Sequence, residues 1–190
     1  MFHYLSLPFE ELNDFLKNLD AGAGKIIQNE KEQEQRSIAS ITKIMTAMVI
    51  IDAGQNPKQM IGNFTREQHI QLALVTSSNE SAIALCNNYP GGKPKCIKDM
   101  NAKAIALNMP NTKFVEASGL SPMNISTALD LLKLVFEASH YPEIVRASQT
   151  PVLNIQIGNK VLSYRNTNPV IGKRYNFIVS KTGSTNAAGS

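Results

Sequence analysis

The sequence predicts an α+β fold in which a cluster of helices packs on an antiparallel sheet. The middle of the 190-residue chain carries apolar residues at helical spacing, and the last part changes to the alternating spacing of strands. Separate runs of helices and strands are typical of this class. With 43% hydrophobic and 18% charged residues, the composition suits one compact domain and argues against disorder.

The segment Arg36–Asp52 is the longest strongly apolar helical pattern, and we expect it to be a helix buried on nearly all sides. Ser40 and Lys43 lie three residues apart in it, on one helix face. A lysine desolvated among Ile and Met side chains has a lowered pKa and can accept a proton from the serine. The pair is a candidate nucleophile and base, although a Ser-x-x-Lys match also arises roughly once by chance in such a chain.

Further helices are predicted on both sides of this segment. Thr65 and Gln68 form a capping box for a helix through Leu74, and Ser126 or Thr127 caps a helix that ends at Ala138. The other predicted helices are 9–20, Glu80–Asn87, Lys95–Leu107 and one that begins at Pro142.

Strands are predicted mainly near the C-terminal end of the chain. Val152–Ile157 and Lys160–Tyr164 read as a hairpin with a two-residue turn. Asn176–Lys181 reads as a strand that is broken by Thr182 and Gly183. Residues 25–28 and 112–115 are shorter candidates.

The charge pattern limits the classes of partner. The net charge of +4 and the pI of about 9.1 fit an anionic surface or polymer, such as a cell-wall polymer. The basic residues are scattered and the chain has no Trp, so no nucleic-acid signature is present. No run of 18 apolar residues predicts a transmembrane helix, and residues 1–18 do not resemble a secretion signal, so a literal reading leaves the chain in the cytoplasm.

The two cysteines and the three histidines show no catalytic or metal-binding spacing. Cys86 and Cys96 are expected either as two buried free thiols or as a disulfide in an oxidising compartment. His3, His69 and His140 match no triad position.

Two further short motifs complete a possible acyl-transfer centre. Ser77-Ser-Asn79 lies in a polar break between two predicted helices, and Lys181-Thr-Gly183 ends a strand. Each motif alone is ordinary, since Ser-x-Asn is common in loops. Three motifs in the order Ser-x-x-Lys, Ser-x-Asn, Lys-Thr-Gly are much harder to obtain by chance, and this is the motif set of serine acyl-transferases acting on penicillin-like or D-alanyl substrates.

Each residue of this set has a physical purpose in acyl transfer. Ser40 is the expected nucleophile, Lys43 its base, and Ser77 the group that passes the proton to the leaving amine. The expected binding groups are Asn79 for a substrate amide, Lys181 and Thr182 for a carboxylate, Gly183 for close backbone approach, and the backbone N–H groups of Ser40 and Ser184 for the oxyanion.

With these motifs in place, residues 36–189 resemble the low-molecular-mass penicillin-binding proteins of the D-alanyl-D-alanine carboxypeptidase family (serine peptidase S11 type), most closely the endopeptidase branch. Besides the three motifs, the resemblance rests on Asn88-Tyr-Pro-Gly-Gly, Met100-Asn-Ala-Lys-Ala, Asn111-Thr-Lys-Phe-Val-Glu, Ser118-Gly-Leu, Asn124-Ile-Ser-Thr-Ala, Tyr164-Arg-Asn-Thr-Asn168 and Ser184-Thr-Asn-Ala-Ala-Gly189.

The resemblance implies a β-lactamase/DD-peptidase-like fold and a periplasmic location. It also implies hydrolysis of peptidoglycan cross-links through an acyl-serine intermediate. The expected partners are peptidoglycan stem peptides and, as covalent inhibitors, β-lactams, with no metal or organic cofactor.

The chain also departs from the family pattern. Residues 1–24 are an atypical N-terminal segment, and 25–190 read as a catalytic domain without the last strands and the C-terminal helix of the family. We therefore expect the Lys-Thr-Gly strand to lack its hydrogen-bonded neighbour. On that basis we expect the isolated chain to fold poorly and to show little activity.

Two other functions fit parts of the pattern. A class A-like β-lactamase needs a deacylating glutamate, and Glu116, Glu137 and Glu143 lie in the right interval but outside a Glu-x-x-Leu-Asn setting. A truncated, non-catalytic remnant that binds cell-wall peptides is the second. Within the family, the sequence does not separate endopeptidase from carboxypeptidase.

Overall fold

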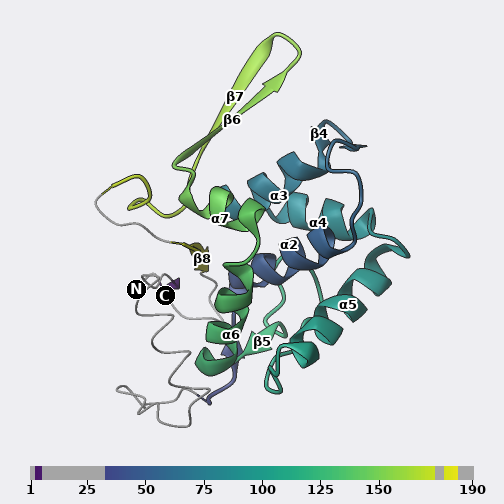
Figure 1. The fold of residues 1–190 in the computed structure, drawn as a ribbon, viewed down its shortest axis with the longest axis vertical. Coiled ribbons are helices and arrows are strands. Elements are labelled where there is room, and N and C mark those ends of the chain that lie inside the picture. The colour runs from purple at the N-terminus through teal and green to yellow at the C-terminus, as the bar shows by residue number, and fades with distance from the viewer. Residues whose placement is uncertain (1–2, 6–32, 174–177, 184–190) are drawn as a thin grey trace.

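A computed structural model describes residues 3–5, 33–173 and 178–183 (Figure 1). The predicted helix 9–20, the predicted strand 25–28 and Ser184 lie outside these ranges.

Helix α2 (Thr42–Asp52) runs through the middle of the helical cluster, with the other helices around it (Figure 1). It contacts α3 (Arg66–Val75), α4 (Asn79–Asn87), α5 (Gly92–Ala106), α6 (Ala128–Ala138) and α7 (Pro142–Gln149). All of its residues from Thr42 to Ile50 are buried, which confirms a helix enclosed on nearly all sides.

The predicted start of this helix at Arg36 was wrong, because the helix begins at Thr42. Arg36–Ser37 form β2, and Ala39–Ile41 form a short 3-10 turn, η1, before α2 begins. Ala39 adopts a positive φ of 45°, which interrupts a regular helix at this point. The apolar pattern continued across the break because Ala39 and Ile41 of η1 are buried, as the helix is.

The remaining helices of the described chain confirm the predicted positions and most of the caps, except that α5 begins at Gly92, three residues before the predicted Lys95. Thr65 and Gln68 exchange both hydrogen bonds of the capping box at the start of α3. The Thr127 side chain accepts from the backbone N–H of Asp130, so Thr127 and not Ser126 caps α6. Helix α7 begins with Pro142 in its first turn.

The described strands pair as four two-stranded antiparallel sheets. The predicted hairpin is confirmed as β6 (Val152–Ile157) and β7 (Lys160–Arg165), which projects from the helical body (Figure 1). The other pairs are β2 with β5 (Ile125–Ser126), β3 (Met60–Ile61) with β4 (Phe64–Thr65), and β1 (His3–Leu5) with β8 (Lys181–Gly183). The predicted strand 112–115 is reduced to one bridge between Lys113 and Ile125. Helices with small antiparallel sheets confirm the α+β class.

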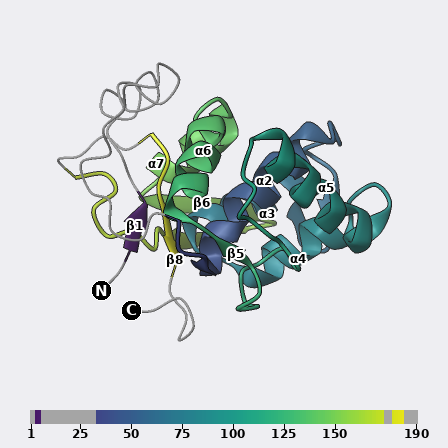
Figure 2. The ribbon, with the colours of Figure 1, turned by 90° about the horizontal axis from the view of Figure 1, so that it is seen from below.

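Strand β8 (Lys181–Gly183) differs from the prediction in its position and in its pairing. Lys181, Thr182 and Gly183 are themselves the strand, where the sequence predicted that they end one. They pair with Leu5, Tyr4 and His3, and β1 lies beside β8 in Figure 2. The expectation that this strand lacks a hydrogen-bonded neighbour is therefore wrong, because β1 occupies its edge.

Cys86 and Cys96 form a disulfide between α4 and α5, so the alternative of two free thiols is wrong. Both residues are buried in the core beside Leu85 and Met100. The bond ties together two helices that pack against α2. None of the helices described is long and apolar enough to cross a membrane.

We expect this disulfide to stabilise the fold by closing a short loop in the unfolded chain. For a separation of 10 residues, the chain-entropy relation gives about 3 kcal/mol in the free energy of unfolding. Urea unfolding with and without a reductant measures this difference.

The double variant Cys86→Ala/Cys96→Ala is the control, because its unfolding midpoint should not respond to the reductant. An equal midpoint for the native chain in both conditions would contradict a stabilising role.

Candidate active site

Ser40 and Lys43 meet at the junction of η1 and α2. The Lys43 Nζ lies 2.8 Å from the Ser40 Oγ, and the hydroxyl is half-buried while the lysine is fully buried. The short 3-10 turn places the serine at the N-terminal end of α2, where the helix dipole favours negative charge. The structure therefore brings the predicted nucleophile and base into direct contact.

The Lys43 ammonium donates to two further oxygens. They are the Asn79 Oδ1 at 2.8 Å and the backbone carbonyl of Ser118 at 2.5 Å. An ammonium has three hydrogens, so these two oxygens and the Ser40 hydroxyl use all of its donors. Burial lowers the pKa of Lys43 to about 8, against the opposing effect of the negative charges on Glu116 and Glu80.

Ser77 and Lys181 form a second contact at the same centre. The Lys181 Nζ donates to the Ser77 Oγ at 2.9 Å and to the backbone carbonyl of Thr182 at 2.7 Å. Burial, together with the positive charge of Lys43, lowers the pKa of Lys181 to about 7. Ser77 has a positive φ of 61°, a strained conformation for a serine that is found mostly where function requires it.

The strand that carries Lys181 packs directly on the nucleophile turn. A Cβ atom built on Gly183 would lie 3.3 Å from the Ile38 carbonyl oxygen, so the glycine allows a close approach. The Thr182 hydroxyl lies 2.6 Å from the hydroxyl of Thr167. The structure thus places Thr182 and Gly183 beside the other predicted residues. Ser184, the second predicted oxyanion donor, is outside the described chain.

Several residues of the site were not assigned a role from the sequence. Gly119 has a φ of 84°, and a Cβ there would lie 1.8 Å from the Ala39 carbonyl oxygen, so only glycine fits. Ser118, Glu116 and Asn124 join it in a loop that contacts α2. These residues lie in segments that carry the family resemblance, and that resemblance was the sequence feature that pointed to this loop.

An open hollow of about 460 Å³ adjoins the site. Its lining includes Ser77, Asn79, Glu80, Phe64 and Tyr164 of β7. Within the described ranges, no three His, Cys, Asp or Glu side chains gather as metal ligands do. The groups that the structure does gather are those of serine acyl transfer.

Solved structures of penicillin-binding proteins share the fold. The chain is similar to penicillin-binding protein D2 from Listeria monocytogenes in its ampicillin-bound form, with a TM-score of 0.76 and 24% identity over 87% of this chain and 76% of that one. It is also similar to the D-alanyl-D-alanine carboxypeptidase from Mycobacterium tuberculosis, with a TM-score of 0.75 and 24% identity over 85% of this chain and 68% of that one.

Relatives of higher identity are D-alanyl-D-alanine endopeptidases. The enzyme from Pseudomonas aeruginosa is 40% identical over 193 residues, which cover 90% of this chain and 62% of the relative. The enzyme from Escherichia coli is 39% identical over 194 residues, covering 90% of this chain and 63% of the relative. The chain thus spans less than two thirds of the length of these two relatives.

The family model described as D-alanyl-D-alanine carboxypeptidase, Peptidase S11, matches residues 18–62 and 55–190. This match includes all three motifs whose side chains meet at Lys43 and Lys181. The chain therefore belongs to the Peptidase S11 family of D-alanyl-D-alanine carboxypeptidases.

Proposed function

We propose that residues 25–190 are the catalytic domain of a serine-type D-alanyl-D-alanine peptidase, preceded by an atypical segment 1–24. The observation that carries this proposal is the buried Lys43 ammonium, which touches both the Ser40 Oγ and the Asn79 Oδ1 at 2.8 Å. A buried lysine with a pKa near 8 can accept and return a proton at moderate pH.

The reaction begins when the Ser40 Oγ attacks the carbonyl carbon of the D-alanine whose amide bond forms the cross-link. Lys43, in its neutral form, takes the hydroxyl proton as the new C–O bond forms. The negative charge on the carbonyl oxygen is stabilised by the backbone N–H groups of Ser40 and Ser184. The C–N bond then breaks, the leaving amine takes a proton, and the acyl group remains on Ser40 until water hydrolyses the ester.

Lys181 is proposed to bind the substrate and to support protonation of the leaving amine through Ser77. Lys181 and Thr182 offer a cation and a hydroxyl to the carboxylate of the substrate. Ser77 is the proposed group that passes a proton to the leaving amine, and its contact with Lys181 at 2.9 Å supports this role. Asn79 holds the substrate amide, and Gly183 allows the substrate backbone to approach strand β8.

The substrates are peptidoglycan stem peptides, and the proposed activity is cleavage of the cross-link between two of them. Support comes from relatives at 40% and 39% identity that are D-alanyl-D-alanine endopeptidases. Fold neighbours from Listeria monocytogenes were solved in ampicillin-bound and cefotaxime-bound forms, so β-lactams are the proposed covalent inhibitors.

The disulfide between Cys86 and Cys96 supports a periplasmic location. Such bonds persist in oxidising compartments and are rare in the cytosol. The net charge of +4 suits work near an anionic cell-wall polymer.

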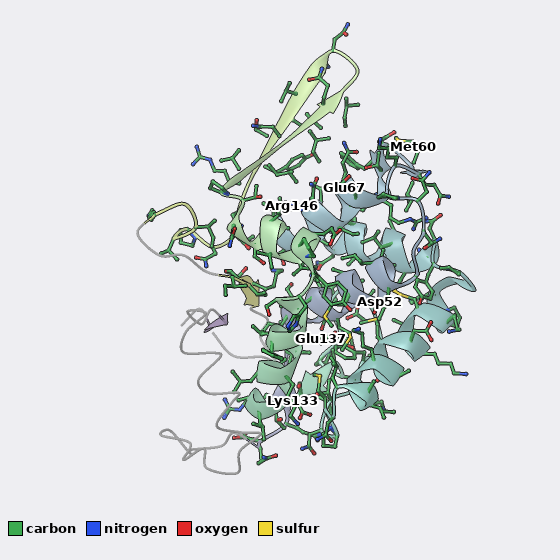
Figure 3. All side chains as sticks on the ribbon, in the orientation of Figure 1. Asp52, Met60, Glu67, Lys133, Glu137 and Arg146 are labelled. Carbon is green, nitrogen blue, oxygen red and sulfur yellow. A yellow bond between two sulfur atoms is a disulfide. The ribbon has the colours of Figure 1, made fainter. Side chains whose placement is uncertain are left out.

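The β-lactamase alternative lacks a well-placed deacylating base among the three candidate glutamates. The Glu116 oxygens already accept four hydrogen bonds, which fills their capacity. Glu137 of α6 pairs with Lys103, which also binds Asp52 of α2. Glu137 and Asp52 are labelled in Figure 3. Glu143 lines a separate hollow beside Ile50 and Arg146. Slow deacylation and a long-lived acyl-enzyme are therefore expected with penicillins.

The first test of this function is acylation of Ser40. Because β1 pairs with β8, the reason given above for expecting little activity is removed. We expect a fluorescent penicillin to label the chain with one equivalent, and the variant Ser40→Ala to take none because it has no nucleophile. Gel fluorescence and intact-mass measurement report both results.

Ser163→Ala is the matched control, because Ser163 lies exposed on the hairpin and its hydroxyl donates to the Asn154 Oδ1. If the chain takes no label, the proposal fails. If Ser40→Ala keeps both its affinity for D-alanyl-D-alanine peptides and its biological effect, the chain is a binding module.

The second test separates the two activities of the family. Incubation with purified cross-linked muropeptide dimers should produce monomers, seen by mass spectrometry as hydrolysis between two stems. Loss of a single terminal alanine with the dimer intact would instead show a carboxypeptidase.

The third test uses the two lowered lysine pKa values. With an acyl ester that has no carboxylate, the acylation rate should rise with pH through about 8, because Lys43 is active only when it has lost its proton. With a penicillin, the acylation rate should also decline as the pH rises through about 7. Lys181, whose pKa is about 7, then loses the positive charge that holds the penicillin carboxylate.

Acylation rate constants measured between roughly pH 5.5 and 10 check both profiles. Identical profiles for the two acyl donors would remove Lys181 from carboxylate binding. A rate that does not change with pH would remove Lys43 as the base.

A further inference from the structure

We propose that Glu116 is a positioning residue for Lys43. It holds the loop that contains the Ser118 carbonyl, which accepts a hydrogen bond from the Lys43 ammonium. Its negative charge sets the pH range over which Lys43 works as a base. The inference rests on the proposed function, because it concerns the same base.

Glu116 organises its own loop through four hydrogen bonds. One carboxylate oxygen accepts from the Ser118 backbone N–H at 2.7 Å and from the Ser118 Oγ at 2.5 Å. The other accepts from the Gly119 backbone N–H at 2.5 Å and from the Asn124 Nδ2 at 2.9 Å. Charge-assisted bonds of this kind are the stronger ones, so the carboxylate determines the path of residues 116–119.

The loop that Glu116 organises contacts one side of α2 at three points. The Ser118 carbonyl accepts from the Lys43 Nζ at 2.5 Å, and the Ala117 carbonyl accepts from the Thr46 Oγ1 at 2.7 Å. The Asn124 Nδ2 also donates to the Thr42 Oγ1 at 3.0 Å. Displacement of the loop therefore moves an acceptor away from the base.

The same loop supports the nucleophile. Gly119 lies so close to the backbone of Ala39 and Ser40 that a Cβ would be 2.9 Å from the Ser40 nitrogen. Its N–H is one of the four donors to Glu116. One carboxylate thus fixes the neighbours of both Ser40 and Lys43.

The charges that act on Lys43 come from three other elements. Lys181 of β8 repels it, while Glu80 of α4 and Glu116 of the loop favour its protonated form, with Glu116 the stronger of the two. Without Glu116, the pKa of Lys43 falls further below its ordinary value. A weaker base has less driving force to take the serine proton, so the carboxylate keeps Lys43 basic enough to act.

The experiment follows Ser40 acylation by a carboxylate-free acyl ester against pH in the full chain. Glu116→Gln should move the midpoint of the rise to lower pH, because a negative charge near Lys43 is gone. Its plateau rate should fall by about 10-fold or more, since misplacement of a catalytic group by a fraction of an ångström is costly.

Ser118→Ala is the matched control, because it removes one donor to Glu116 but leaves the carboxylate charge and the carbonyl contact. It should lower the melting temperature without moving the midpoint. Glu137→Gln, a carboxylate engaged with Lys103, should leave both the midpoint and the plateau unchanged.

A midpoint for Glu116→Gln equal to that of the native chain would overturn the inference, as would an equal shift in Ser118→Ala. Should the glutamine variant not fold, Glu116→Asp keeps the charge but withdraws the carboxylate from its four donors. Its plateau rate should fall, and an unchanged plateau would overturn the inference. The proposed function fails separately, if the native chain is not labelled by penicillin at any pH.

Discussion

The buried ammonium of Lys43 is the interaction on which the rest of this structure depends. Burying a charge is costly unless every donor is matched, and here three elements each supply one acceptor: the nucleophile turn, the start of α4 and the loop at Ser118. A lysine held in this way is fixed in position and has a pKa near 8. The same arrangement therefore serves packing and the proposed base catalysis.

Local backbone strain is concentrated around this lysine. Ala39 and Ser77 both have positive φ values, which non-glycine residues rarely adopt, and they lie next to the nucleophile and in the Ser-x-Asn motif. Gly119 admits no side chain because the backbone of Ala39 occupies that space. These conformations persist because the enclosing helices and the Glu116 hydrogen bonds over-determine them.

The two lysines also constrain each other. Lys181 is 2% exposed, and its pKa is lowered by burial and by the charge of Lys43, so the site holds two cations that disfavour each other. In the proposed function, a substrate carboxylate held by Lys181 and Thr182 would relieve this repulsion.

The sequence alone determined the local features, namely the apolar helix with Lys43, the capping box at Thr65, the hairpin and the order of the three motifs. These follow from residues that are close in the chain, where periodicity and capping chemistry act directly. Only the tertiary structure decided that Cys86 pairs with Cys96, that β1 lies beside Lys181, and that the Ser118 carbonyl accepts a hydrogen bond from Lys43. Those contacts join segments that only the folded chain brings together, and backbone groups and carboxylates leave no spacing signal that would indicate their partners.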